Sequence, residues 1–148
     1  MKIRIKTEVE APLNIVWNNF TEELFTSLNP PFPPVKLIRF DGSNTNDVVE
    51  LELNFILFKQ KWISLITAQT TTESYIEFID EGTTLPFFLS KWKHQHRMEK
   101  TEKGTCIIDN IEYKAPFLLS FLLYPTLLLQ FMYRKPIYKK FFKSKATV

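Results

Sequence analysis

Residues Lys91–Met98 alternate strictly between two kinds of side chain. One set is Trp92, His94, His96 and Met98, and the other is Lys91, Lys93, Gln95 and Arg97. Side chains of a strand point alternately to opposite faces of a sheet. The segment therefore predicts a strand with a solvent-exposed cationic face and an inward face that carries both imidazoles. The chain has no other histidine. We therefore expect both imidazoles inside, where each needs a hydrogen-bond partner.

The same period of two recurs through most of the chain and predicts an antiparallel sheet. Turn residues separate the alternating runs, as at Asp41-Gly42 and Lys103-Gly104, and Glu81-Gly82-Thr83 is expected to reverse the chain as well. The expected strands are residues 2–10, 35–40, 49–55, 62–70, 75–80, 91–99 and 105–113. This count gives a sheet of about seven strands.

Helical patterns occur in two places. Pro12 followed by apolar residues at helical spacing, and then Thr21-Glu22-Glu23, predict two short helices after the first strand. After Pro116 the chain is helical in character and apolar on nearly all sides up to Tyr133. That stretch falls short of the ~20 residues needed to span a bilayer, so we expect a helix buried in its own protein and kinked at Pro125.

Composition limits the remaining possibilities. A chain of 148 residues fits one domain, residues 1–148, and its aromatic fraction of 15% favours a bulky or hollow interior. A net charge of +3 gives no argument for a nucleic-acid partner. The single cysteine, Cys106, is expected to be an inert residue facing away from Asp109, and it fits a reducing compartment. With an N-terminal strand in place of a signal peptide, the expected location is cytoplasmic.

This order of elements resembles the START-like, birch-pollen-allergen-like helix-grip superfamily (SRPBCC) over the whole chain. A narrower set of residues is similar to its bacterial ligand-binding branch, which is labelled cell-division-inhibitor-like or cyclase/dehydrase-like: Trp92-x-His94-x-His96, Gly104-Thr105, Asp109, Glu112-Tyr113, Pro116 and Arg134. The resemblance implies an α+β helix-grip fold, in which a curved antiparallel sheet of about seven strands wraps around a long C-terminal helix and encloses a cavity.

Polar and aromatic residues of the expected inward faces form the candidate ligand site. Asp109 shares a face with Ile107, Ile111 and Tyr113, and pairing this strand with the preceding one brings Asp109 close to His94 or His96. The predicted ligand-binding residues are Trp92, His94, His96, Asp109, Tyr113, Leu51, Leu53, Phe55 and Trp62. Ordinary core packing explains the apolar members of this set equally well.

Three functions fit these features. The favoured one is binding, transport or sequestration of a small hydrophobic or amphipathic molecule in the cavity. A cyclase- or dehydratase-like enzyme with a cavity histidine as general acid or base is the first alternative, but the sequence lacks a complete catalytic set. The second is a module that contacts a membrane or a protein through the apolar helix and the basic tail 134–145, although pairing of these cations with the helix dipole explains the tail too.

No cofactor is predicted. The chain has three glycines and no phosphate-binding loop, and His94-x-His96 is its only metal-ligand spacing, with no clear third ligand. Three carboxylates lie on the solvent-exposed faces of their expected strands: Glu8, Glu50 and Glu52. They are expected to be solvated rather than catalytic.

Overall fold

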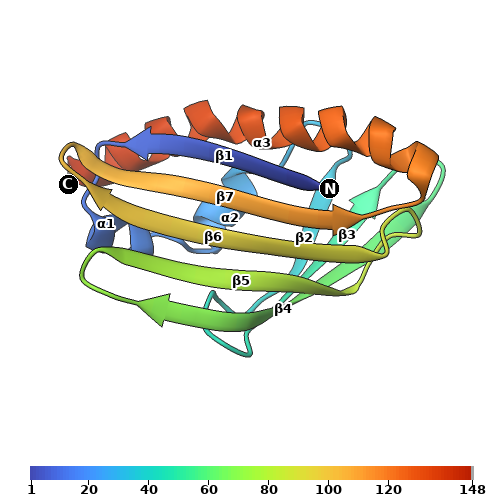
Figure 1. Ribbon diagram of the computed structural model, residues 1–148, viewed down its shortest axis with the longest axis horizontal. Helices are drawn as coiled ribbons and strands as arrows, with labels where there is room; N and C mark the ends of the chain where they lie inside the picture. The colour runs from blue at the N-terminus through green and yellow to red at the C-terminus, as the bar shows by residue number, and fades with distance from the viewer. Residues whose placement is uncertain (148) are drawn as a thin grey trace.

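The computed structural model describes residues 1–147 and contains one antiparallel sheet with three helices (Figure 1). The strands are β1 Lys2–Val9, β2 Val35–Phe40, β3 Val48–Asn54, β4 Lys59–Thr71, β5 Tyr75–Thr84, β6 Lys91–Thr101 and β7 Gly104–Lys114. The helices are α1 Leu13–Asn18, α2 Glu22–Ser27 and α3 Phe117–Ala146. The sheet order is β1-β7-β6-β5-β4-β3-β2, so the N-terminal strand joins the last hairpin.

The two faces of β6 differ as the alternation predicts. Trp92, His94, His96 and Met98 are buried, whereas the four residues between them are only partly buried. β6 pairs with β7 in a register that sets His96 opposite Asp109. This register places the carboxylate beside the imidazoles, on the inner face of the sheet.

One expected reversal is wrong. Residues 81–83 were predicted to end the fifth strand, but β5 continues to Thr84 and stays paired with β4. The register shifts by one residue where Gly82 pairs with Ser64, so the glycine marks an irregularity in the strand instead of a turn. A side chain at Gly82 would collide with Leu85, the first residue of the actual loop before β6.

The interior contains two apolar clusters. One joins α1, α2 and the C-terminal half of α3 to the sheet, through buried residues that include Val16, Leu24, Met98, Tyr138 and Phe142. The other lies under the opposite end and includes Ile3, Trp92, Ile111, Tyr113, Leu127 and Phe131. On β6 and β7 the residues between these clusters are polar: His94, His96 and Asp109.

The half of the long helix that is buried is not the half that the sequence predicts. α3 runs unbroken through Pro125 and Pro136 along the sheet beside β1 (Figure 1). Only 11% of its most apolar 18-residue window is buried, so the prediction of a buried helix is wrong for its first half. The basic tail instead contains the fully buried Tyr138 and Phe142. A helix that is apolar all round can turn only one face toward a sheet, and the other faces of this half stay exposed.

Candidate functional site

A cavity of about 150 Å³ lies between the inner face of the sheet, α2 and α3. Its wall is mostly apolar and includes Leu24, Leu51, Leu53, Trp62, Phe78 and Phe131. The ionisable side chains of the wall are Asp80, His94, His96 and Arg134, and neutral polar residues such as Asn29, Ser64 and Gln130 also line it. A mostly apolar enclosure with a few polar groups is the usual form of a small-molecule site.

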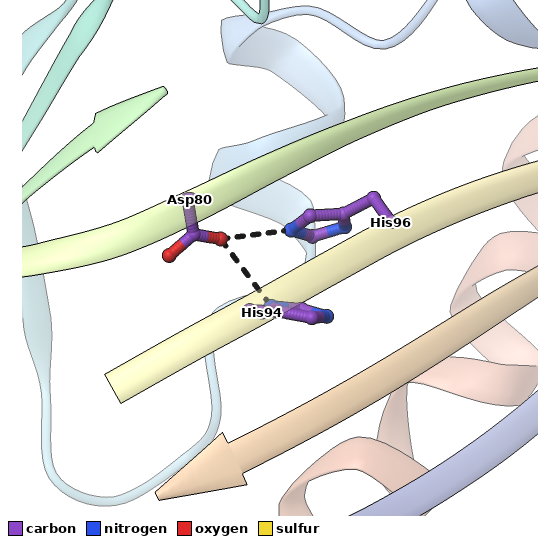
Figure 2. Close-up of side chains that lie close together, drawn as sticks. All are labelled: Asp80, His94 and His96. Carbon is purple, nitrogen blue, oxygen red and sulfur yellow. Dashed lines mark hydrogen bonds and ion pairs between the residues drawn. The ribbon is translucent and has the colours of Figure 1, made fainter. Parts of the chain in front are cut away.

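Two imidazoles stand between two carboxylates beside this cavity. Nε2 of His94 lies 2.9 Å from Oδ1 of Asp109, and Nε2 of His96 lies 3.1 Å from Oδ2 of Asp80. Nδ1 of His94 is also 3.5 Å from Oδ2 of Asp80. Figure 2 shows both imidazoles, which come from β6, directed toward this one oxygen of Asp80, which comes from β5. The strand period of two places the histidines side by side, with ring centroids 3.6 Å apart.

Aromatic rings hold the imidazoles in place. Phe78 stacks on His96 with ring centroids 4.3 Å apart and an interplanar angle of 13°. Phe131 of α3 meets His94 edge-on at 5.1 Å. The indole Nε1–H of Trp92 donates a hydrogen bond of 3.0 Å to Oδ1 of Asp80. The rings exclude water from one side of the cluster and fix the orientation of its polar atoms.

Burial and charge act in opposite directions on these groups. Burial disfavours the ionised form of Asp80, but the hydrogen bond from His96 and the charge of His94 hold the pKa of this carboxyl below its ordinary value. The pKa of Asp109 is lowered in the same way, against its own burial, by the hydrogen bond with His94. Burial, together with the neighbouring His94, lowers the pKa of His96 to about 4. Both carboxyls are therefore ionised and His96 is neutral near pH 7.

α3 adds two further groups beside the cluster. The guanidinium of Arg134 lies over the Phe131 ring, 4.2 Å from its centroid, and its charge contributes to the lowered pKa of Asp109. Tyr138 is fully buried, and its hydroxyl makes no hydrogen bond of good geometry among residues 1–147, although the Arg134 guanidinium lies near enough to act on it. Burial raises the pKa of this hydroxyl, so it stays protonated.

No family model matches the sequence, and no curated protein matches it. Solved structures do match the fold. Protein Ms6760 from Mycobacterium smegmatis has a TM-score of 0.68 at 16% identity, over 97% of this chain and 91% of that one. Ara h 8.0201 has a TM-score of 0.59 at 11% identity, over 93% of this chain and 97% of that one.

A third match is StfQ, a di-domain ARO/CYC protein from the steffimycin biosynthetic pathway. It has a TM-score of 0.74 at 11% identity and covers 99% of this chain, which corresponds to 52% of StfQ. The three similarities extend over 93–99% of this chain, and so include its seven-stranded sheet and its long C-terminal helix. The chain has the helix-grip fold.

The helix-grip fold and the resemblance to its superfamily, both predicted from the order of elements, are confirmed at the level of the fold. The narrower likeness to a bacterial branch, carried by the motif around Trp92-x-His94-x-His96, stays a prediction. Sequence identities of 11–16% show that these proteins have a similar fold. They do not identify a ligand or a reaction for this chain.

Six of the nine predicted ligand-binding residues line the helix-grip cavity. They are Leu51, Leu53, Trp62, Trp92, His94 and His96. Phe55 instead follows the end of β3 and packs with Phe58 and Phe88 in a separate aromatic group. Asp109 lies behind His94, and the hydroxyl of Tyr113 points to the Ser120 carbonyl and the Met1 sulfur. A direct ligand contact by any of the nine stays a prediction.

Sequence reasoning missed Asp80, the residue on which both imidazoles converge. A signal for it was present, because Ile76, Phe78 and Asp80 alternate with Glu77 and Ile79 and so share the inner face of β5. Asp80 was placed at the end of the expected strand 75–80, directly before the expected reversal, and was not considered as a site residue. The observed pairing of Asp80 with His94 across β5 and β6 makes its position clear.

Proposed function

We propose that this protein binds a small hydrophobic or amphipathic molecule in the helix-grip cavity. The observation that carries the proposal is the cavity itself, with a mostly apolar wall and its ionisable groups limited to Asp80, His94, His96 and Arg134. The apolar body of the ligand would contact Leu51, Leu53 and Phe131, and its polar end would face the imidazoles and Arg134. The names of two neighbours in fold, an ARO/CYC protein and Ara h 8.0201, are compatible with this proposal.

Native mass spectrometry of the purified chain, followed by solvent extraction, tests for a bound apolar species. A sharper test adds bulk to the cavity. Leu51→Trp fills space on the inner face of β3, whereas Glu52→Trp places the same side chain on the partly exposed outer face. We expect affinity for a fluorescent apolar probe to fall at least roughly tenfold in Leu51→Trp and to stay unchanged in Glu52→Trp. Equal binding by the two folded variants would show that the probe does not occupy the cavity.

The enzymatic alternative depends on whether an imidazole moves a proton. His94 contacts the Asp109 carboxylate as an oriented general base would, at 2.9 Å. Replacing His94 by Gln separates the two functions once a ligand is found. A binding protein loses affinity alone, whereas an enzyme loses turnover while it keeps much of its affinity.

A second candidate function is docking on a membrane surface, and the first half of α3 favours it. Its large apolar side chains are exposed, including Phe117 at 75%, Leu118 at 81% and Leu122 at 65%. Two loops add Leu57, 92% exposed, and Phe87, 70% exposed. These loops meet through the Phe58–Phe87 ring contact. Large apolar side chains exposed in such numbers are typical of an interaction site.

The positive charge of α3 favours binding to a membrane with anionic headgroups. The helix carries six Lys or Arg residues and no Asp or Glu, and besides Arg134 on the cavity wall and Lys145 paired with Glu23 these are Lys135, Lys139, Lys140 and Lys143. Cations next to an apolar face are attracted by anionic headgroups, each by about 1 kcal/mol near the surface. By length and composition α3 could also cross a membrane, but Leu127, Phe131, Tyr138 and Phe142 pack it into both core clusters along the sheet.

Vesicle co-sedimentation tests this second function. We expect binding to vesicles that contain phosphatidylserine, weaker binding to phosphatidylcholine alone, and loss of binding in Leu118→Asp/Leu122→Asp. Lys61→Glu, on the outer side of β4 and paired with Glu50, serves as a charge control that should leave binding intact. Deleting the basic part of the helix is unsuitable, since Tyr138 and Phe142 are core residues. Failure of the wild type to sediment with either vesicle would remove this function.

A further inference from the structure

Three side chains on the cavity wall direct one ligand atom each to a common point. Oδ2 of Asp80 lies 3.5 Å from Nδ1 of His94 and 3.1 Å from Nε2 of His96 (Figure 2), and the three residues offer ligand atoms all within 4.8 Å of one another. Zinc bonds of about 2.0–2.2 Å to nitrogen and oxygen set neighbouring ligands roughly 3–3.5 Å apart. We propose that Asp80, His94 and His96 bind a divalent transition-metal ion of the zinc class.

The surrounding residues fit the outer shell of such a site. The far nitrogens of both imidazoles face one oxygen of Asp109, with Nε2 of His94 at 2.9 Å and Nδ1 of His96 at 3.5 Å. The far oxygen of Asp80 accepts the Trp92 hydrogen bond at 3.0 Å. Metal-bound histidines characteristically donate their second N–H to a carboxylate, and metal-bound carboxylates are themselves hydrogen-bonded.

A metal ion also accounts for a polar atom that the protein leaves without a partner. Nδ1 of His96 is buried and has no hydrogen-bond partner among residues 1–147. A neutral His96 that donates its one proton to Asp80 must turn a lone pair toward Asp109, where two acceptors repel. If the inner nitrogens coordinate a metal, both protons move to the outer nitrogens, which then donate to Asp109.

Charge balance agrees with this assignment. Asp80 and Asp109 bring two carboxylates into a region where the side chain of Asp109 is 1% exposed and that of Asp80 is 13% exposed. Buried charge is stable when it is paired or coordinates a metal. One divalent cation held by two neutral imidazoles gives both carboxylates a cationic partner within the cluster, in addition to the Arg134 guanidinium that acts on Asp109.

The donor set indicates the class of metal and the kind of site. Two imidazoles and a carboxylate suit Zn²⁺ or Fe²⁺ better than Mg²⁺ or Ca²⁺, which prefer oxygen ligands. Three protein ligands leave a coordination position, as in catalytic rather than structural zinc sites. All three ligands line the cavity, so this position faces the space that a small molecule would enter.

Metal binding is tested without any organic ligand. The result therefore does not depend on whether the cavity also binds the hydrophobic molecule of the proposed function. The untagged full chain, stripped with a chelator, is titrated calorimetrically with Zn²⁺ and by absorption with Co²⁺. We expect one ion per chain and a Co²⁺ visible spectrum typical of a four- or five-coordinate site. Asp80→Asn and His96→Gln should weaken Zn²⁺ binding more than about 100-fold, and Asp109→Asn about 10–100-fold.

Glu77→Gln is the matched control. It makes the same carboxylate-to-amide change on the opposite face of β5, where Glu77 pairs with Arg97, and should leave Zn²⁺ affinity unchanged. Melting temperatures with and without Zn²⁺ give a second measurement, because the ion should raise the Tm of the wild type but not that of Asp80→Asn. If the wild type shows no saturable binding of Zn²⁺, Co²⁺ or Fe²⁺ at micromolar concentrations, or if folded Asp80→Asn and His96→Gln bind as tightly as the wild type, the proposal is wrong.

Discussion

The indole of Trp92 and the carboxylate of Asp80 form a hydrogen bond of 3.0 Å that links β6 to β5 inside the core. Because the acceptor is an ionised group with little solvent, we expect Trp92→Phe to lower the free energy of unfolding by about 1.5–3 kcal/mol. Urea denaturation followed by circular dichroism measures the change.

Trp62→Phe is its control. The Trp62 indole donates to the neutral hydroxyl of Ser64 at 3.1 Å, in a partly buried position. Loss of a neutral hydrogen bond there should cost about 0.5–1.5 kcal/mol. Equal losses in the two variants would mean that the charge of Asp80 contributes nothing to the Trp92 bond.

The two fully buried tyrosines should respond differently to removal of the hydroxyl group. Tyr113 donates to the Ser120 carbonyl at 3.3 Å, whereas Tyr138 makes no hydrogen bond of good geometry in the described part of the chain and has only the Arg134 guanidinium near its hydroxyl. We expect Tyr113→Phe to lose about 1 kcal/mol and Tyr138→Phe to be neutral or slightly more stable than the wild type, since an unpaired buried hydroxyl costs free energy. Thermal and chemical unfolding report both changes. A loss above about 1 kcal/mol in Tyr138→Phe would reveal a partner for that hydroxyl.

Two leucines on α3 should contribute very differently to the stability of the fold. Leu127 is 8% exposed and packs in the second core cluster, whereas Leu122, on the same helix, is 65% exposed. Leu127→Ala is expected to cost about 2–5 kcal/mol, and Leu122→Ala to change stability by no more than about 0.5 kcal/mol. The free energies of unfolding of the two variants test this. Similar losses would place Leu122 in contact with something in solution, such as a second chain.

Cys106 should be unreactive in the folded protein. It lies on the face of β7 opposite to Asp109, and burial together with the nearby Glu8 raises the pKa of its thiol to about 11. Only the thiolate reacts with alkylating agents, so at pH 8 roughly 0.1% of the folded chains carry the reactive form. Iodoacetamide labelling, followed by mass spectrometry, should be at least about 100-fold slower in buffer than in guanidinium chloride. Comparable rates would show that Cys106 is accessible.

Local patterns predict much of this fold because each strand obeys the same two-residue period. The period assigns the inner and outer faces of β6 and β7, and their pairing brings Asp109 to the histidines. Glu50 and Glu52 were expected to be solvated, and they form ion pairs with Lys61 and Lys59 on the outer side of the sheet. These features depend on neighbours in sequence or on adjacent strands, which alternation reports directly.

Prediction fails where a residue's partner is distant or where packing geometry decides. Gly82 has the composition of a turn, yet pairing with β4 keeps it in a strand, and Asp80 is thereby held on the inner face. The apolar half of α3 was expected to be buried because it lacks polar residues. Hydrophobicity alone does not say how much of a helix a sheet can cover.

The sequence by itself determined the kind of protein: a helix-grip domain whose only histidines face inward from one strand. Only the tertiary structure decided that Asp80 and Arg134 join Asp109 at these histidines, because they come from β5 and α3 and converge through strand register and helix placement. It also decided which half of α3 is buried. Alternation fixes the face on which a side chain lies, whereas the distances between faces depend on how the whole chain packs.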